Sequence, residues 1–237
     1  MTKELASRAG LATIGKAHVF VSSLEKPELS DEDRHHLERV LRLGPNETVT
    51  ASDGFGRWRC CWLRSGDLRP MDQVIEAVPA RQPIGIAVAL LKGDRTEWVV
   101  QKLAELGVDR ITLLETGRSV VKWSQDRQDR QLERMRKVAR EAAMQSRQAY
   151  LPIVEGPVKL GALADEPGIA LADHEGGALT AETAVLVIGP EGGWTPAERV
   201  IFKHRVTLGS FNLRSETAAL FGASLLVATR TRLVAWA

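Results

Sequence analysis

Residues 184–198 read Ala-Val-Leu-Val-Ile-Gly-Pro-Glu-Gly-Gly-Trp-Thr-Pro-Ala-Glu: a short apolar run, a glycine-rich turn and the start of a helix. The run is typical of a parallel strand buried on both faces. In the helix start, Thr195 is the N-cap, Pro196 the first helical residue and Glu198 the third, which is the pattern of a capping box. Glycines at a strand exit let backbone groups approach a ligand, and α/β sheets bind ligands at the carboxyl ends of their strands. The segment therefore predicts a ligand-binding loop in an α/β fold. The alternative is a tight turn that needs a positive φ.

Two more glycine-bearing loops follow short apolar runs. One is the predicted loop from Asp173 to Gly177, after the run Ile169 to Ala172. The other begins at Leu208-Gly209 and leads into an apolar helix at about Thr217 to Val227. Three glycine loops at strand ends predict one shared pocket. The loop at Gly189 matches neither the phosphate loop Gly-x-x-x-x-Gly-Lys nor the dinucleotide fingerprint Gly-x-Gly-x-x-Gly, which disfavours ATP and NAD.

The chain from Ile84 onward alternates apolar runs with helical patterns, which is typical of a sheet covered by helices. Ile84 to Leu91 and Ile111 to Leu114 are predicted strands. A helix is predicted between them, with a capping-box variant at its start (Asp94, Glu97), inward-facing side chains (Trp98, Leu103, Leu106) and a stop at Gly107. A long basic helix is predicted at about Gln128 to Ser146.

The first part of the chain, from His18 to about Val78, has short alternating or β-branched runs and a turn signal at Asp53-Gly54. These runs predict a small β domain with strands at Val19 to Val21, Thr48 to Ala51, Trp58 to Leu63 and Val74 to Val78. One helix interrupts it, with Ser30 as N-cap, an apolar stripe of Leu37, Val40 and Leu41, and a stop at Gly44-Pro45. Pro79 to Pro83 is a predicted linker. We therefore expect an extension at 1–17, poorly ordered up to Lys16, a β domain at 18–79 and an α/β domain at 80–237.

The composition narrows the class of protein. The 237 residues are 44% hydrophobic and 26% charged, which excludes disordered and fibrous proteins. The longest apolar stretch falls far short of the roughly 20 residues of a membrane span, so no membrane partner is expected. Cys60 and Cys61 are adjacent and point to opposite faces of a strand, which gives neither a disulfide framework nor a metal-ligand spacing. We expect no metal and a reducing cytoplasm.

Six short sequence blocks follow one another in the second part of the chain. They are Gly93-Asp-Arg-Thr-Glu-Trp98, Lys102-Leu-Ala-Glu-Leu-Gly-Val108, Arg118-Ser-Val-Val-Lys122, Glu141-Ala-Ala-Met-Gln-Ser146, Gly189-Pro-Glu-Gly-Gly193 and Leu213-Arg-Ser-Glu-Thr-Ala218. With them the chain resembles the RsmE-type family, which comprises 16S ribosomal RNA uridine N3-methyltransferases of the SPOUT superfamily. The blocks His35-His36-Leu37, Val40 to Leu43 and Asp53-Gly54 are similar to the family's N-terminal domain, so the resemblance covers nearly the whole chain.

The resemblance implies a fold, a cofactor and an assembly. It implies an N-terminal PUA-like β-barrel that binds RNA, a C-terminal SPOUT-type α/β domain with a trefoil knot, and a homodimer. It also implies S-adenosylmethionine as the cofactor, with a pocket on the loops already singled out. The cofactor residues expected are Ala172, Asp173, Gly189, Pro190, Glu191, Gly192, Gly193, Leu208, Gly209, Leu213, Thr217 and Ala218.

Arg214 and Glu216 are the candidate catalytic residues. N3 of uracil carries a proton that must leave before or during methyl transfer, which calls for a base or for positive charge near the uracil. Arg214 is expected to bind the uracil carbonyl oxygens or a phosphate, and Glu216 to take the proton or to orient Arg214. The alternative is a surface ion pair and a helix cap.

Charge distribution bears on RNA binding. The formal net charge is only +2, but nine basic and four acidic residues lie between Arg118 and Arg147. That stretch is expected to contact phosphates, or alternatively to be a solvated helix face. His35 and His36 are expected to pack or to contact RNA rather than bind metal. The expected RNA-binding residues are His35, Arg39, Arg42, Lys92, Arg95, Arg118, Lys122 and Arg147.

Two other functions fit parts of the sequence. One is a SPOUT methyltransferase for another RNA, such as a transfer-RNA ribose, and the preceding β domain argues against it. The other is a non-catalytic RNA-binding assembly factor on the same fold. Such a factor would tolerate loss of the glycine loop and of Arg214, and both are present.

Overall fold

The computed structural model describes residues 11, 13–78 and 82–234 and divides the chain into two units. The first unit comprises Met1–Pro79 and Glu141–Leu151, and the second Ala80–Arg140 and Pro152–Ala237. The first unit is therefore discontinuous, because an eleven-residue segment from the middle of the chain joins it. The sequence pattern does not predict this. Part of the predicted linker lies outside the described residues.

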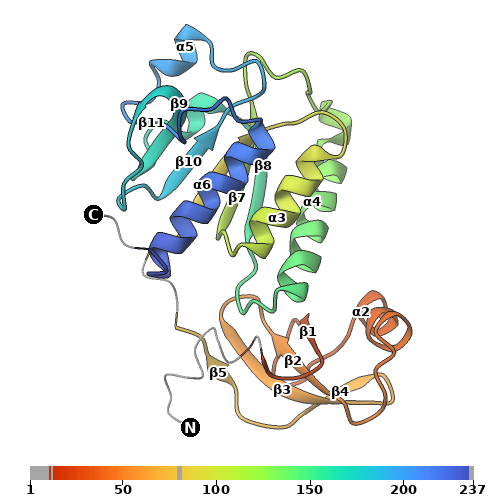
Figure 1. The fold of residues 1–237 in the computed structure, drawn as a ribbon. Coiled ribbons are helices and arrows are strands. Elements are labelled where there is room, and N and C mark those ends of the chain that lie inside the picture. The colour runs from red at the N-terminus through yellow and green to blue at the C-terminus, as the bar shows by residue number, and fades with distance from the viewer. Residues whose placement is uncertain (1–10, 12, 79–81, 235–237) are drawn as a thin grey trace. The chain divides into compact units, whose positions relative to one another are not determined.

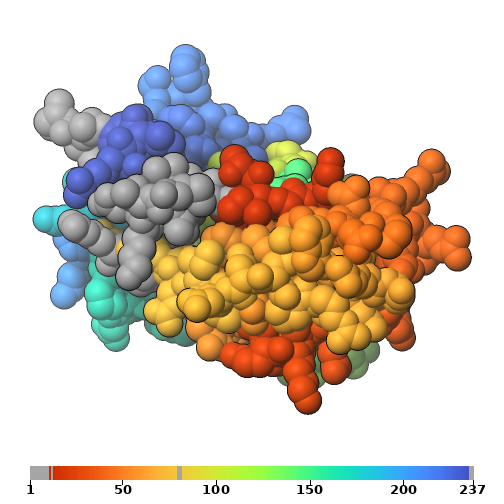
Figure 2. Space-filling view, turned by 90° about the horizontal axis from the view of Figure 1, so that it is seen from below, coloured from red at the N-terminus to blue at the C-terminus, as the bar shows by residue number. Residues whose placement is uncertain are grey.

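The first unit is built on a five-stranded sheet, whose strands are β1 (Ala17–Phe20), β2 (Thr48–Ser52), β3 (Arg57–Arg64), β4 (Asp67–Pro70) and β5 (Ile75–Glu76). The order is β1-β2-β3-β4, with β5 also paired to β3; only the β1–β2 pair is parallel. Alternation along β3 sends Cys61 into the cluster of Val19 and Val49, and Cys60 into the cluster of Trp58. The predicted strands are present, although the last is much shorter. Figure 2 shows one face of this unit, coloured red to orange.

The helix of the first unit differs from its prediction. Ser30 does cap α2 (Asp31–His35), with its Oγ accepting from the Asp33 N–H at 3.1 Å. The chain then continues as a π-helical turn, η1 (His36–Val40), closed by the Leu41 N–H on the His36 carbonyl oxygen. A π-helical turn changes the angle between successive side chains around the helix axis. Of the expected apolar stripe, only Leu37 is therefore buried, while Val40 and Leu41 are 59% and 43% exposed.

The segment before β1 is packed where it is described. Leu11 is buried in the cluster of Trp58, and the Arg147 guanidinium donates to the carbonyl oxygens of Ile14, Gly15 and Lys16 at 2.9–3.1 Å. The expectation of a poorly ordered extension is therefore wrong for these residues. Residues 1–10 and 12 lie outside the described part of the chain.

The second unit contains a six-stranded parallel sheet of β6 (Gly85–Ala89), β7 (Arg110–Glu115), β8 (Ile153–Lys159), β9 (Ile169–Gly177), β10 (Val185–Ile188) and β11 (Arg205–Val206). Its order is β11-β9-β10-β6-β7-β8. All residues of β6 and β10 are buried, as parallel strands covered on both faces require. Two details correct the sequence analysis. The predicted loop from Asp173 to Gly177 is part of β9, and the strand before Leu208 ends at Val206.

Four helices and one 3-10 turn, η2 (Leu160–Leu163), complete the described part of this unit, and one of the helices continues into the first unit. The helices are α3 (Arg95–Glu105), α4 (Gln125–Gln145, of which Glu141–Gln145 belongs to the first unit), α5 (Pro196–Arg199) and α6 (Ser215–Arg230). Helices α3 and α6 lie side by side, and α6 packs on β6 and β10 (Figure 1). Gly222 permits this approach, because a Cβ there would overlap the Leu186 side chain.

The start of α3 also departs from expectation. The Asp94 side chain makes no cap hydrogen bond; the Thr96 hydroxyl instead accepts from the Leu91 N–H at 2.9 Å. Leu103 is buried and Leu106 half-buried, but Trp98 is 43% exposed and does not face inward. Within the described residues, no helix combines the length and apolar character needed to cross a membrane.

Candidate functional site

A pocket of about 740 Å³, including its open mouth, lies beyond the carboxyl ends of β10 and β11 and beside residues 172–174 of β9. All three segments singled out in the sequence contribute to it, two of them as loops and the third, around Asp173, as part of strand β9. Ten of the twelve expected cofactor residues line it: Ala172, Asp173, Gly189, Pro190, Glu191, Gly193, Leu208, Gly209, Leu213 and Ala218. The parallel sheet brings these residues together because its strands all end at this edge.

Close packing fixes the loop after β10. A Cβ on Gly189 would lie 2.9 Å from ring atoms of Trp194, so this position has no room for a side chain. The Trp194 ring is buried, and its Nε1 donates to the Ala172 carbonyl oxygen at 2.8 Å. The Ser215 hydroxyl, in the first turn of α6, donates to the Gly189 carbonyl oxygen at 2.7 Å. These two hydrogen bonds connect the loop after β10 to strand β9 and to helix α6.

The capping box of α5 is present as predicted. The Thr195 Oγ1 accepts from the Glu198 N–H, and the Glu198 carboxylate accepts from the Thr195 N–H at 2.8 Å. The same carboxylate accepts from the Gly117 N–H at 2.7 Å, which ties the loop after β7 to the loop after β10. Burial alone would raise the pKa of Glu198, but the hydrogen bonds from Gly117 and Thr195 outweigh it, and the pKa lies below its usual value.

A buried carboxylate joins three elements beside the pocket. Asp173, on β9, has a side chain that is 1% exposed, and its Oδ2 lies 2.9 Å from Nε of Arg199 on α5. Arg205, on β11, approaches the same oxygen at 3.8 Å. A buried carboxylate needs such partners. Asp173 therefore holds α5 and β11 against β9.

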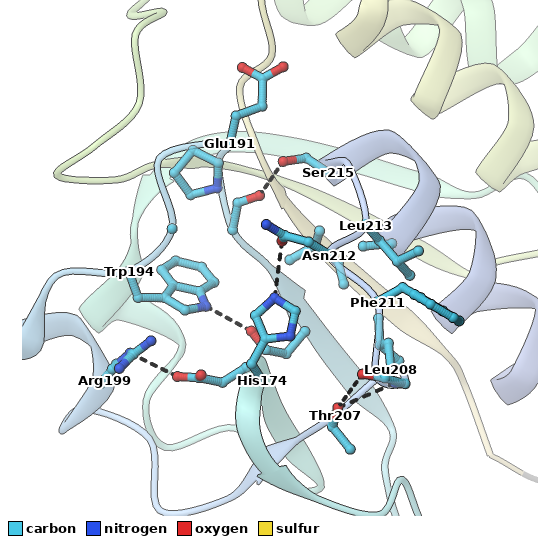
Figure 3. Close-up of a pocket in the computed structure, with 18 residues that line it drawn as sticks. His174, Glu191, Trp194, Arg199, Thr207, Leu208, Phe211, Asn212, Leu213 and Ser215 are labelled. Carbon is cyan, nitrogen blue, oxygen red and sulfur yellow. Dashed lines mark hydrogen bonds and ion pairs between the residues drawn. The ribbon is translucent and has the colours of Figure 1, made fainter.

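His174 and Asn212 point toward one another across the pocket, as Figure 3 shows. The His174 Nε2 and the Asn212 Oδ1 are 3.1 Å apart. This hydrogen bond links β9 to the loop before α6. The sequence analysis placed both residues in segments of the predicted pocket but did not predict their contact, because a pair 38 positions apart has no local signature.

Four expected site residues do not line the pocket. Gly192, Arg214 and Thr217 are exposed, and Glu216 is half-buried. Arg214 is the N-cap residue of α6, and its guanidinium has no hydrogen bond or ion pair to any described residue. The pocket also has lining residues that the sequence analysis did not propose for the cofactor: His174, Ile188, Trp194, Arg199, Thr207, Phe211, Asn212 and Ser215.

Arg95 lies at this edge of the second unit. Its guanidinium forms ion pairs with Glu191, which lines the pocket, and with Glu216 of α6. The hydrogen bond to Glu191 raises the pKa of Arg95 above its usual value. Arg95 was expected among the RNA contacts, which stays a prediction; in the structure it has two carboxylate partners.

The other expected RNA residues fall into two groups. His35, Arg39, Arg42, Lys92 and Lys122 are exposed, and for them RNA contact stays a prediction. Two others serve the protein's own backbone. Arg118 donates to the Gly192 carbonyl oxygen at 3.0 Å, and Arg147 holds the three carbonyl groups before β1.

Comparison with known proteins identifies this class of fold and site. The family model described as an RNA methyltransferase domain matches residues 78–227, which is more than half of the chain. The α/β unit and its pocket are therefore those of an RNA methyltransferase.

Similar proteins give the family more closely. The chain is 32% identical to "Ribosomal RNA small subunit methyltransferase E" of Mycobacterium bovis, over 79% of this chain and 80% of the relative. It is 31% identical to the protein of that name in Bacillus subtilis, over 84% and 88%. The chain belongs to this family of RNA methyltransferases.

Solved structures agree in fold. A methyltransferase of Legionella pneumophila, solved with the bound cofactor SAM, superposes with a TM-score of 0.79 at 26% identity, covering 91% of this chain and 98% of that one. A ribosomal RNA small subunit methyltransferase E of Neisseria gonorrhoeae, bound to S-adenosylmethionine, gives 0.75 at 25%, covering 89% and 96%.

Proposed function

We propose that this protein transfers the methyl group of S-adenosylmethionine to N3 of a specific uridine in 16S ribosomal RNA of the small subunit. The observation that carries the proposal is the pocket beyond the ends of β10 and β11 and beside β9, in a chain of the RNA methyltransferase family. The names of the relatives support a small-subunit ribosomal RNA as substrate, and the ligands of the two solved neighbours support the cofactor.

The residues present fit that cofactor. Within the described residues, the backbone N–H groups of Leu208 and Leu213 donate no hydrogen bond, so the pocket wall offers free polar groups to a nucleoside edge. Ile188 and Ala218 add apolar surface. Glu191 supplies a carboxylate at the rim, which suits a cationic ligand. When bound, S-adenosylmethionine supplies an electrophilic methyl group.

The chain's own residues then have to hold the base and move one proton. The guanidinium of Arg214 is exposed and has no partner among the described residues, so it is suited to the uracil carbonyl oxygens or to a phosphate. Glu216 is suited to accept the N3 proton. N3 lies on the Watson–Crick edge, so the target uridine has to be unpaired or flipped out when it reacts.

The division of labour between the two parts of the chain is part of the proposal. We assign RNA binding to a PUA-like barrel at 18–79, after an extension at 1–17, and catalysis to a SPOUT-type domain at 80–237. The exposed His35, Arg39 and Arg42 support RNA contact by the first. The insertion of β10 between the earlier strands β9 and β6 supports a trefoil knot in the second.

We also propose a homodimer in the cytoplasm, where ribosomes are assembled. Two large apolar side chains support the dimer: Trp98 on α3 and Phe221 on α6 are 43% and 44% exposed on helices that pack together. Burying them against a second copy would remove apolar surface from water. The molar mass in sedimentation equilibrium tests this, and a monomer at every concentration would contradict it.

The test of the main proposal uses small ribosomal subunits from a strain that lacks this gene. Purified protein and labelled S-adenosylmethionine are added, and the modified nucleoside is located by mass mapping of the 16S RNA. We expect one N3-methyluridine. A methylated ribose or a transfer-RNA product would favour another RNA as substrate. Cofactor binding without any transfer would favour an assembly factor.

A further inference from the structure

Arg95 joins two carboxylates that come from distant parts of the chain. It lies in the first turn of α3, and its Nη1 forms ion pairs with Glu191 of the glycine loop and with Oε1 of Glu216, the latter at 3.6 Å. Glu216 follows Ser215, whose hydroxyl is bonded to the Gly189 carbonyl oxygen. One guanidinium nitrogen therefore connects the pocket rim to the start of α6.

The two oxygens of Glu216 have different surroundings. Oε1 faces Arg95, whereas Oε2 is buried and accepts no hydrogen bond from any described residue. The side chain as a whole is only 14% exposed. A buried carboxylate oxygen is unfavourable unless a cation stabilises the charge or a ligand provides a donor. Within the described part of the chain, Arg95 is the one cation in ion-pair range of Glu216.

We propose that Arg95 is a positioning residue for methyl transfer, which holds the Glu216 carboxylate in place to accept the N3–H of the substrate uracil. The inference rests on the proposed function. In the step it serves, the N3 proton passes to Glu216, the bond from N3 to the methyl carbon forms, and the methyl–sulfur bond breaks to release S-adenosylhomocysteine. The positive charge of the sulfonium and the negative charge of Glu216 disappear together.

This arrangement also accounts for a preference between pyrimidines. Uracil carries a hydrogen on N3 and cytosine does not, so a fixed acceptor opposite N3 favours uracil. A site built around one hydrogen bond rejects an analogue that lacks the matching group far better than an apolar pocket does. Glu216, held by Arg95, is such an acceptor.

The phosphate contact predicted for Arg95 from the sequence is less consistent with the structure. Arg95 and its two carboxylate partners carry one positive and two negative charges, so their sum is negative. A phosphate would be repelled by Glu191 and Glu216 at the distance where it met Arg95. Arg214, with no partner among the described residues, is the better cation for a phosphate.

The test compares Arg95→Gln with wild type and with Lys102→Gln. Lys102 is the matched control, because it lies on the same helix and, among the residues that the structure describes, its side chain pairs only with Glu105, at 2.6 Å. We expect Arg95→Gln to lower kcat about 10- to 100-fold at saturating RNA and cofactor, as for loss of a charge-assisted contact. The RNA KM and the calorimetric Kd for S-adenosylmethionine should stay within about 3-fold. An unchanged kcat with a raised RNA KM would instead show a phosphate contact and overturn the proposal.

Two further variants separate positioning from simple destabilisation. Arg95→Lys keeps the charge and should regain at least part of the lost kcat; a kcat as low as that of Arg95→Gln would contradict the proposal, even if Arg95→Gln itself failed to fold. On a Glu216→Gln background, Arg95→Gln should cost less than about 2-fold in kcat, because its partner is already gone. The full 10- to 100-fold loss on that background would also refute it. If wild type and Lys102→Gln transfer no methyl group, the proposed function itself fails.

Discussion

Substituting Gly189 by Ala tests how the site is built. The new Cβ would lie 2.9 Å from Cε2 and Cζ2 of Trp194, whereas carbon atoms in contact prefer about 3.5–4.0 Å. The ring would have to move by roughly 0.5–1 Å. It is 6% exposed and hydrogen-bonded through Nε1 to the Ala172 carbonyl oxygen at 2.8 Å, so a shift of the ring strains that bond.

The expected cost follows from those contacts. Overpacking of this kind costs about 1–3 kcal/mol, and the strained hydrogen bond adds up to about 1 kcal/mol. For a chain of this size each kcal/mol lowers Tm by roughly 2–4 °C, so we expect a fall of at least about 2 °C. S-adenosylmethionine affinity should drop about 10-fold or more, because Gly189 and Trp194 both line the pocket.

Thermal unfolding and calorimetric titration of the same preparations provide the assay. Gly161→Ala is the control, since a Cβ there meets nothing within 4 Å, and its stability should stay within about 0.5 kcal/mol of wild type. Trp194→Phe removes the ring atoms that clash, so Gly189→Ala should cost less on that background. If Gly189→Ala matched Gly161→Ala in both assays, the inferred clash would be wrong.

Three other variants or treatments probe separate features. Glu198→Gln should destabilise the fold by about 1 kcal/mol at pH 7. Because the folded pKa of Glu198 lies below 4.5, its contribution is complete above pH 4.5 and is lost as pH falls through the folded pKa, so the gap between wild type and variant should close in acid. A gap that did not change with pH would contradict this. Burial raises the pKa of Cys60 to about 12 and that of Cys61 to about 11, so native thiols should react with iodoacetamide at pH 8 at least about 100-fold more slowly than unfolded ones; rapid native labelling would show that the thiols are accessible. Arg147→Ala should lower the free energy of unfolding by about 2 kcal/mol through loss of its three carbonyl contacts, measured against exposed Arg130→Ala. Equal stability with weaker RNA binding would restore the RNA role predicted for Arg147.

The parts of the fold that the sequence predicts are those that local patterns determine. The short apolar runs become strands, Ser30 and Thr195 cap their helices, and the capping box at Thr195 and Glu198 forms as expected. The two glycine loops after β10 and β11 and the segment at Asp173 were enough to predict one pocket, because a parallel sheet places the carboxyl ends of its strands on one edge. Each of these inferences needs only residues close together in the chain.

The errors come from tertiary contacts. The stripe at Leu37, Val40 and Leu41 assumed a regular α-helix, and a π turn moved two of its members to the surface. The Asp173 segment, expected as a loop, is an extension of β9, because Asp173 pairs with arginines from α5 and β11 that are distant in sequence. The segment 141–151 joins the first unit although nothing local marks it.

The same distinction applies to the basic residues for which RNA contact is predicted. The sequence around a basic residue does not show whether its side chain forms an ion pair or hydrogen bond within the folded protein. Arg118 and Arg147 are engaged by carbonyl oxygens, and Arg95 by two carboxylates, whereas Arg214 has no partner among the described residues. A guanidinium that already has good partners gains little from a phosphate, because it must give up those contacts to bind one. Arg214 is therefore the cation of this set best placed to meet RNA, and Arg95 the one best placed to act within the protein.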